Sequence, residues 1–347
     1  MKSAGIICRL IAAALASASL CLDAYGQNQS ALDAAGIQAQ RLEHLWWVFF
    51  YICIGVYVVV MAVLLSALFK RKTPEGDIGP DVKPDQAREK RAGVVVKSAV
   101  GMTAVVILAL MIMSFHTGRA IGSQQYAPRP LTLKITGSQW WWFIEYFDNA
   151  DPSKNIRTAN ELHLPVGRTV QVEFTSTDVI HSFWVPNLHG KIDLIPNYPT
   201  TFFFQPDKEG VYAGQCAEFC GYQHAKMRFT VYVHSQADFD AWANAQRQTP
   251  AAPPDSALQR GQQIFLTSTC TQCHSVQGTP ANGSVGPNLT HVASRKYIAA
   301  GSLQNTNENL RKWITDPQAI KPGNRMPMHT YSDEDLTSLV TYIESLK

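Results

Sequence analysis

The stretch GQCAEFCGYQHAKM (residues 214–227) places two cysteines, a histidine and a methionine within one short segment. Three kinds of site suit these side chains: a zinc site, a disulfide with the histidine and methionine uninvolved, or a copper site. A C-x3-C spacing is unusual for structural zinc, and methionine is a poor zinc ligand. A disulfide between Cys216 and Cys220 would leave His224 and Met227 without a role. Thiolate, imidazole and thioether donors together favour copper.

The segments around this stretch have the pattern of short β-strands. In TVQVEFT (169–175), strict alternation would place Val170, Val172 and Phe174 on one face. Turn formers separate this run from similar ones before and after it. The pattern predicts an all-β Greek-key sandwich over residues 128–236.

A copper site on a β-sandwich loop commonly takes a further histidine from a distant strand. His181, in STDVIHSFWVP (176–186), follows a strand and precedes Cys216 by 35 residues. We expect His181 to be this ligand. A second cysteine four residues after the first would let two thiolates bridge two copper ions. The competing histidines of the region are His163, His189 and His234.

A second cysteine motif, CTQCH (270–274), is typical of covalent haem attachment. Cys270 and Cys273 would each form a thioether with one haem vinyl group, and His274 would ligate the iron. A disulfide is the alternative in an oxidising compartment, but five residues in this order are specific for haem attachment. A thioredoxin-like redox pair would require a βαβ context, which the sequence does not show. Zinc would require a further ligand pair, and no cysteine follows in the sequence.

A c-type haem usually takes methionine as its second axial ligand. KPGNRMPMHTYSDEDL (321–336) offers Met326 and Met328 just before a final apolar-striped helix, and we favour Met326. The order of haem motif, Gly-Pro loop, methionine and terminal helix resembles small c-type cytochromes. It predicts an all-α class I cytochrome c domain over 256–347, joined by a linker (237–255) with a Pro/Ala-rich core.

Apolar residues concentrate near the N-terminus. Residues 1–26 resemble a cleaved secretory signal peptide. Residues 27–120 predict a transmembrane hairpin with helices at about 45–69 and 95–117, each long enough to cross a ~30 Å hydrocarbon core. The segment between the spans is strongly basic, which places it in the cytoplasm and both termini outside. Its eight basic residues are Lys70, Arg71, Lys72, Lys83, Arg88, Lys90, Arg91 and Lys97.

The charge balance narrows the class of protein further. The chain has 347 residues and a net charge of +3, and its lysines and arginines do not cluster outside the loop between the spans. This distribution argues against nucleic-acid binding, while the apolar spans require membrane lipid.

Taken together, these motifs make the chain similar to subunit II of haem-copper cytochrome c oxidases, with a fused cytochrome as in the caa3 type. The aromatic run GSQWWWFIEY (137–146) supports the same resemblance. It implies a binuclear CuA centre, with the cysteines bridging two coppers and Trp140 receiving electrons. The implied copper-binding set is His181, Cys216, the carbonyl of Glu218, Cys220, His224 and Met227.

The resemblance also implies partners and a location. A translocating cytochrome-c oxidase in a bacterial cell membrane would pair this chain with catalytic subunit I and with subunit III, and both redox domains would face the periplasm. An external c-type cytochrome or another periplasmic donor would reduce its haem c. Oxygen chemistry would reside in subunit I, and a magnesium ion shared with it would meet the Glu218 carboxylate. The alternative is a membrane-anchored haem c/CuA carrier serving another reductase.

Two positions bear on finer features of this family. Glu89 precedes the second span where family members place a glutamate at a proton channel, although a solvated salt bridge is the simpler interpretation. DLIPNY (193–198) keeps Asp193 but has Asn197 and Tyr198 where the family commonly has glycine and arginine. The role of that arginine at a subunit interface is therefore in doubt for this chain.

Overall fold

The computed structural model describes residues 29–69, 86–122, 129–148 and 150–347. The expected signal peptide and most of the basic loop lie outside the described residues. Two compact units are present: residues 40–126 form one, and the residues up to Ala39 together with those from Ala127 onward form the other.

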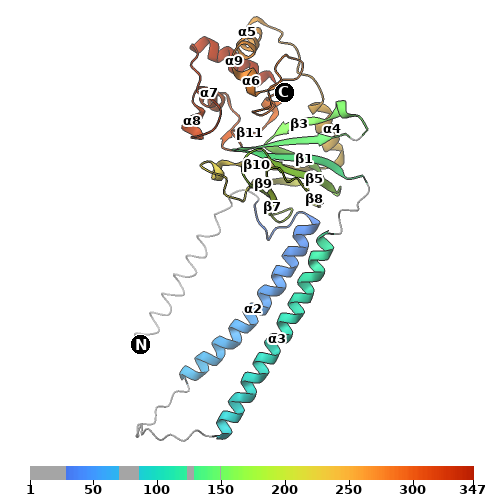
Figure 1. Cartoon of the computed structure of the whole chain (residues 1–347), viewed down its shortest axis with the longest axis vertical. Helices are drawn as coiled ribbons and strands as arrows, with labels where there is room; N and C mark the ends of the chain where they lie inside the picture. Colours follow the sequence, from blue (N-terminus) through green and yellow to red (C-terminus); the bar gives the residue numbers. More distant parts are fainter. Residues whose placement is uncertain (1–28, 70–85, 123–128, 149) are drawn as a thin grey trace. The chain divides into compact units, whose positions relative to one another are not determined.

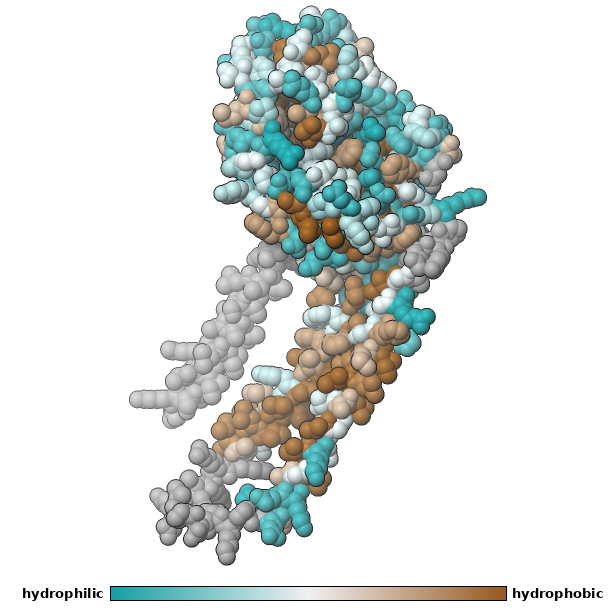
Figure 2. Space-filling view, in the orientation of Figure 1, coloured by the Kyte–Doolittle hydropathy of each residue, from teal (hydrophilic) through white to brown (hydrophobic). Residues whose placement is uncertain are grey.

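The first unit is a pair of long helices, α2 (Ile37–Phe69) and α3 (Gln86–Gly122) (Figure 1). At 1.5 Å per residue they extend roughly 50 and 55 Å, more than a membrane core requires. Each helix exceeds its predicted span because it continues into polar flanking residues. Apolar side chains are exposed along both helices (Figure 2), as expected for surfaces that face lipid. Arg41 donates a hydrogen bond to the Ala120 carbonyl and so joins the two helices.

The second unit begins with a sandwich of two five-stranded sheets. One sheet has the order β3-β2-β1-β5-β8 and the other β4-β10-β9-β6-β7. Pairs β1/β5 and β4/β10 are parallel, and the others are antiparallel. The strands are β1 (Leu131–Ser138), β2 (Trp141–Phe147), β3 (Ile156–Ala159), β4 (Glu161–Pro165), β5 (Val170–Ser176), β6 (His181–Trp184), β7 (Ile192–Leu194), β8 (Thr200–Phe204), β9 (Gly210–Cys216) and β10 (Arg228–His234).

Alternating burial explains why these segments form a two-layered core. In β1 and β5 every second side chain is buried, including Ile135 and Phe174, while the residues between them are partly exposed. Trp142 is fully buried, and its indole ring makes edge contacts with Phe183 and Phe229. These contacts join β2 of one sheet to β6 and β10 of the other, and Phe183 pairs with Cys216 at the start of the cysteine loop.

The predicted linker differs from the structure in its first half. Residues Gln236–Gln246 form helix α4, which Ser235 caps by accepting a hydrogen bond from the Asp238 amide. Phe239 is buried in the core of the sandwich, and the indole of Trp242 stacks on His163 at 4.1 Å between ring centroids. Burial of these apolar side chains favours a docked helix over an extended tether, so the connection to the next domain begins only after α4.

The C-terminal domain is helical, as predicted. Helices α5 (Ser256–Thr267) and α9 (Asp333–Ser345) pack closely at Gly261, where a Cβ atom would lie 2.1 Å from the Ser338 carbonyl oxygen. Phe265 and Leu339 are almost completely buried between them. The remaining elements are α6 (Cys270–Cys273), η4 (Val292–Ser294), β11 (Tyr297–Ile298), β12 (Leu303–Gln304), α7 (Asn307–Thr315) and α8 (Pro317–Ile320).

Candidate electron-transfer site

The strands β6 and β9 bring the predicted copper ligands together. Phe183 pairs with Cys216, so the start of β6 lies beside the end of β9 and brings His181 next to the thiol. The Cys216 Sγ atom lies 3.9 Å from His181 Nδ1 and 3.8 Å from Cys220 Sγ. Cys220 Sγ lies 3.6 Å from His224 Nδ1 and 3.8 Å from Met227 Sδ. Two free thiols, two imidazoles and a thioether thus surround one small volume, a donor set that suits copper.

The electrostatics of the cluster favour one thiolate. The contact with Cys220 lowers the pKa of Cys216, although burial opposes this change, and the same contact raises the pKa of Cys220. Burial of His181 disfavours its charged form, but hydrogen bonds to Asp178 and Cys216 outweigh burial and raise its pKa. The cluster therefore retains protons that metal binding would release.

Asp178 orients the His181 ring. Its Oδ1 atom lies 2.9 Å from His181 Nε2, and because a carboxylate only accepts, Nε2 carries the proton. The lone pair of Nδ1 then points toward Cys216 and is available to a metal. Partners of this kind fix the tautomer of metal-binding histidines. Asp178 was not among the residues predicted from the sequence, although its position three residues before His181 is a usable signal.

Trp140 also contacts the cysteine loop, through the backbone of Cys220. Its indole Nε1 donates a hydrogen bond of 2.9 Å to the Cys220 carbonyl, and the Gln139 side chain donates a second one of 2.8 Å to the same oxygen. Gly221 allows this approach, because it has a φ of +106° and a Cβ there would lie 3.2 Å from the indole. The predicted electron-receiving tryptophan thus touches the backbone of a predicted ligand.

The three histidines ranked below His181 as candidate ligands lie in other surroundings. His163 Nδ1 and His234 Nε2 lie 2.8 Å apart in a hydrogen bond, and His189 packs edge-on against Phe202. Burial lowers the pKa of His189 to about 4, so this side chain is neutral at physiological pH.

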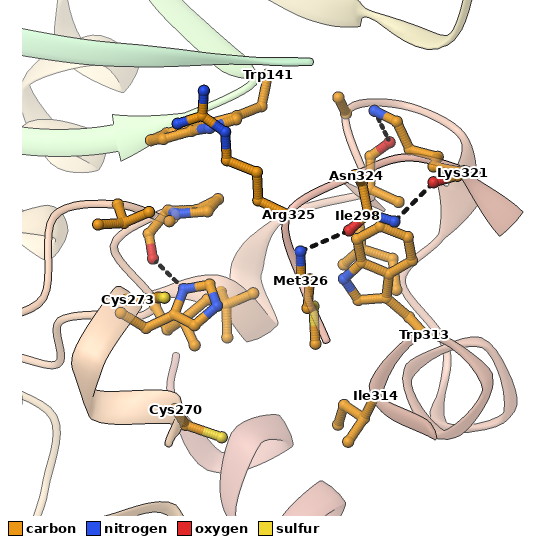
Figure 3. Close-up of a pocket in the computed structure, with 18 of the residues that line it drawn as sticks. Trp141, Cys270, Cys273, Ile298, Trp313, Ile314, Lys321, Asn324, Arg325 and Met326 are labelled. Carbon is orange, nitrogen blue, oxygen red and sulfur yellow. Dashed lines mark hydrogen bonds between the residues drawn. The ribbon is translucent and has the colours of Figure 1, made fainter. Parts of the chain in front are cut away.

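A cavity of about 890 Å³ occupies the C-terminal domain and reaches the sandwich (Figure 3). Its walls are mainly apolar, as a tetrapyrrole requires, and its size falls within the range of pockets for compact organic ligands. Cys270 and Cys273 face it from α6, and Met326 faces it from the segment between α8 and α9. Trp140 and Trp141 of the sandwich also line it.

His274 is prepared to bind a metal inside this cavity. Its Nδ1 atom lies 2.7 Å from the Pro287 carbonyl oxygen, which can only accept, so Nδ1 carries the proton and Nε2 keeps its lone pair. Burial lowers the pKa of His274 and keeps the ring neutral. Gly286 leaves space for the ring, since a Cβ there would lie 2.7 Å from it. These residues fit a covalently attached haem.

The two candidate methionines differ in environment. Met326 is partly buried and packs on the apolar core of the domain, whereas the Met328 side chain is 64 % exposed. The Asn324 side chain accepts a hydrogen bond from the Met326 amide, and Gln318 donates one to its carbonyl. This bracing fixes the Met326 segment beside the cavity and favours it as the axial ligand.

The structure also shows where Glu218, Asn197, Glu89 and Lys321 lie. The Glu218 carbonyl oxygen lies 3.2 Å from Cys216 Sγ, while its side chain is exposed. Asn197 has a φ of +59°, a conformation that asparagine tolerates better than most residues, which explains how it replaces the family's glycine. Glu89 lies exposed in the first turn of α3. Sequence reasoning also missed Lys321, which is 3 % exposed in a segment typical of a solvated loop.

Comparison with known proteins agrees with this architecture. Residues 149–234 match the family "Cytochrome C oxidase subunit II, periplasmic domain", and residues 258–347 match "Cytochrome c". Cytochrome c oxidase subunit 2 of Alkalihalophilus pseudofirmus is 33 % identical over 92 % of this chain and 92 % of its own. Cytochrome c oxidase subunit 2 of Bacillus sp. PS3 is 32 % identical over 71 % of this chain and 73 % of its own. The solved periplasmic domain of Bradyrhizobium japonicum cytochrome oxidase subunit II is 32 % identical over 35 % of this chain and 96 % of its own, with a TM-score of 0.32.

A sulfur-rich β-sandwich loop beside a c-type cytochrome domain, both attached to an apolar helical hairpin, defines a membrane-anchored electron-transfer protein. The chain belongs to the cytochrome c oxidase subunit 2 family, in the form that carries a fused cytochrome c. It is therefore a subunit of a haem-copper oxidase, and it accepts electrons through haem c and CuA for the oxygen-reducing subunit I.

Proposed function

We propose that Cys216 and Cys220 bridge two copper ions. In this assignment His181 and His224 each bind one copper, and Met227 and the Glu218 carbonyl are weak axial ligands. When bound, such a pair accepts and releases one electron with little change in geometry. The observation that carries the assignment is the distance of 3.8 Å between the two free sulfur atoms, each with an imidazole nitrogen within 3.9 Å.

A Cys220→Ser variant tests this assignment. With one thiolate, the site can no longer bridge two metals, and we expect one copper in place of two. Copper content per chain, measured on the purified oxidase, gives the answer. Retention of both coppers in the variant would contradict the bridging role.

We further propose that Cys270 and Cys273 attach the haem and that His274 and Met326 ligate its iron. Support comes from the neutral, pre-oriented His274 ring and from the position of Met326 at the same cavity. Electrons would then pass from the haem by way of Trp140, whose indole hydrogen-bonds to the Cys220 carbonyl.

The orientation in the membrane and the remaining partners complete the proposal. The basic segment between the spans supports a cytoplasmic loop and periplasmic redox domains. An external c-type cytochrome would supply the electrons, and subunit III would complete the assembly. The exposed Glu218 carboxylate would hold magnesium at the contact with subunit I. Protease added to intact spheroplasts should remove the C-terminal domain but not cleave the basic loop; the reverse would invert the orientation.

A further inference from the structure

Lys321 is the most deeply buried ammonium group in the part of the chain that the structure describes outside the membrane hairpin, at 3 % exposure. Its Nζ atom donates to three backbone carbonyls: Trp140 at 2.8 Å, Lys226 at 3.0 Å and Ala299 at 3.3 Å. An ammonium group has three protons, so each has an acceptor. Trp140 and Lys226 belong to the sandwich, whereas Lys321 and Ala299 belong to the cytochrome domain. The group therefore joins two domains.

The residues on either side of Lys321 also contact the sandwich. The Gln223 side chain donates a hydrogen bond of 2.9 Å to the Pro322 carbonyl, and Lys226 donates one to the Ile320 carbonyl. Gly323 packs against the Trp140 indole, where a Cβ would lie 3.7 Å from the ring. Residues 320–323 thus lie along the cysteine loop and cover Trp140, which is 8 % exposed.

The same segment leads directly to the predicted haem ligand. Arg325 Nη2 lies 3.8 Å from the Oδ2 atom of Asp178, whose Oδ1 orients His181. Met326 follows and lines the cavity, as do Lys321 and Asn324 (Figure 3). One short stretch of chain therefore contacts the surroundings of the proposed copper ligands and also carries the proposed iron ligand.

From this geometry we infer that Lys321 is a positioning residue that holds the cytochrome domain in one register on the sandwich, with the haem cavity against Trp140. The inference rests on the proposed electron path and adds what fixes it. Because residues 320–323 cover Trp140, an external donor meets the cytochrome domain and not this tryptophan. A second contact limits rotation about Lys321: the Lys296 amide donates a hydrogen bond of 2.8 Å to the Glu161 carboxylate.

The chemistry of the contact explains why lysine is suited to it. A compact ammonium supplies three donors from one atom, whereas the planar fork of arginine would need more width. In a Lys321→Met variant the stem keeps its length, but the three carbonyls lose their donor. Each buried acceptor left without a partner favours separation of the domains, where water can satisfy it.

The test uses the complete oxidase with a Lys321→Met subunit, and a flash photoreductant that delivers electrons to haem c. The measured quantity is the rate of haem c oxidation by CuA. We expect this rate to fall by about tenfold or more, since loss of the buried hydrogen bonds shifts the domains away from the docked register. The optical and EPR spectra of both centres should not change.

A matched control is Lys312→Met, which removes an exposed lysine on α7 of the same domain, paired there with Glu308. Its rate should equal that of the wild type. Lys226→Met serves as a second test if the Lys321 variant does not assemble, because Lys226 is exposed and contributes one bond across the same contact. Its rate should fall by less than that of Lys321→Met.

Two results would overturn the inference. An unchanged transfer rate in Lys321→Met, or in Lys226→Met if only that variant assembles, would show that these bonds do not set the register. A slower rate accompanied by altered copper or haem spectra would assign the effect to the metal sites themselves. Absence of a CuA signal from the wild-type oxidase would instead contradict the proposed function.

Discussion

Replacement of Asp178 by asparagine tests how firmly the protein prepares its copper site. The carboxylate lies 2.9 Å from His181 Nε2 and holds the proton on that nitrogen, so that Nδ1 faces Cys216 at 3.9 Å. An amide can present its NH2 group to Nε2, which favours the wrong tautomer, and it lacks the negative charge. Loss of such a partner typically weakens metal binding roughly 10- to 100-fold, equivalent to about 1.4–2.7 kcal/mol.

The assay is a competition between the copper-loaded protein and a chelator of known copper affinity, followed by the visible absorption of the centre. Glu173→Gln is the matched control, because it removes an acidic charge from the same domain where Glu173 pairs with Lys134 at the surface. The control should retain wild-type affinity. Equal affinity of Asp178→Asn and wild type would refute the reasoning that the carboxylate sets the tautomer.

Three further predictions concern ligation, packing and pH. Met326→Ala should lose the methionine-ligated haem spectrum while Met328→Ala, at a 64 % exposed position, retains it; the opposite result would exchange the assignment. Gly261→Ala should lower the free energy of unfolding by about 1–3 kcal/mol in thermal denaturation, because its Cβ would meet the Ser338 carbonyl; a gain in stability would contradict that close approach. Burial lowers the pKa of His189 to about 4, so the unfolded chain binds a proton near pH 6.5 that the folded chain refuses. Stability should therefore fall between pH 6.5 and 4 by up to ~3 kcal/mol more than in His189→Gln, and equal losses in both proteins would contradict this.

Periodic patterns in the sequence predicted most of the helices and strands. Uncharged apolar runs predicted both long helices, and alternation predicted the buried faces of strands such as β5. The linker prediction was wrong in its first half because it rested on Pro/Ala-rich composition, although the spacing of the apolar residues before it indicated a helix. Phe239 and Trp242 lie three residues apart on one helical face, and Ser235 stands at the N-cap, so the signal for α4 was present.

The candidate site was likewise predictable from the sequence only in part. Local motifs predicted the cysteines, His224 and Met227 as ligands, because the ligands of a metal site are close in sequence when one loop supplies them. His181 required the additional expectation of a distant strand. Lys321 could not be predicted, because a lysine followed by Pro-Gly-Asn is typical of a solvated turn, and its three carbonyl acceptors lie on segments far away in the sequence. Contacts between domains leave no periodic signal in either partner.

Metal and haem analysis of the purified subunit tests the central claim most directly. We predict two coppers and one covalently bound haem for each chain, with a mixed-valence EPR signal from the copper pair. A single copper, or zinc in a stoichiometric amount, would contradict it.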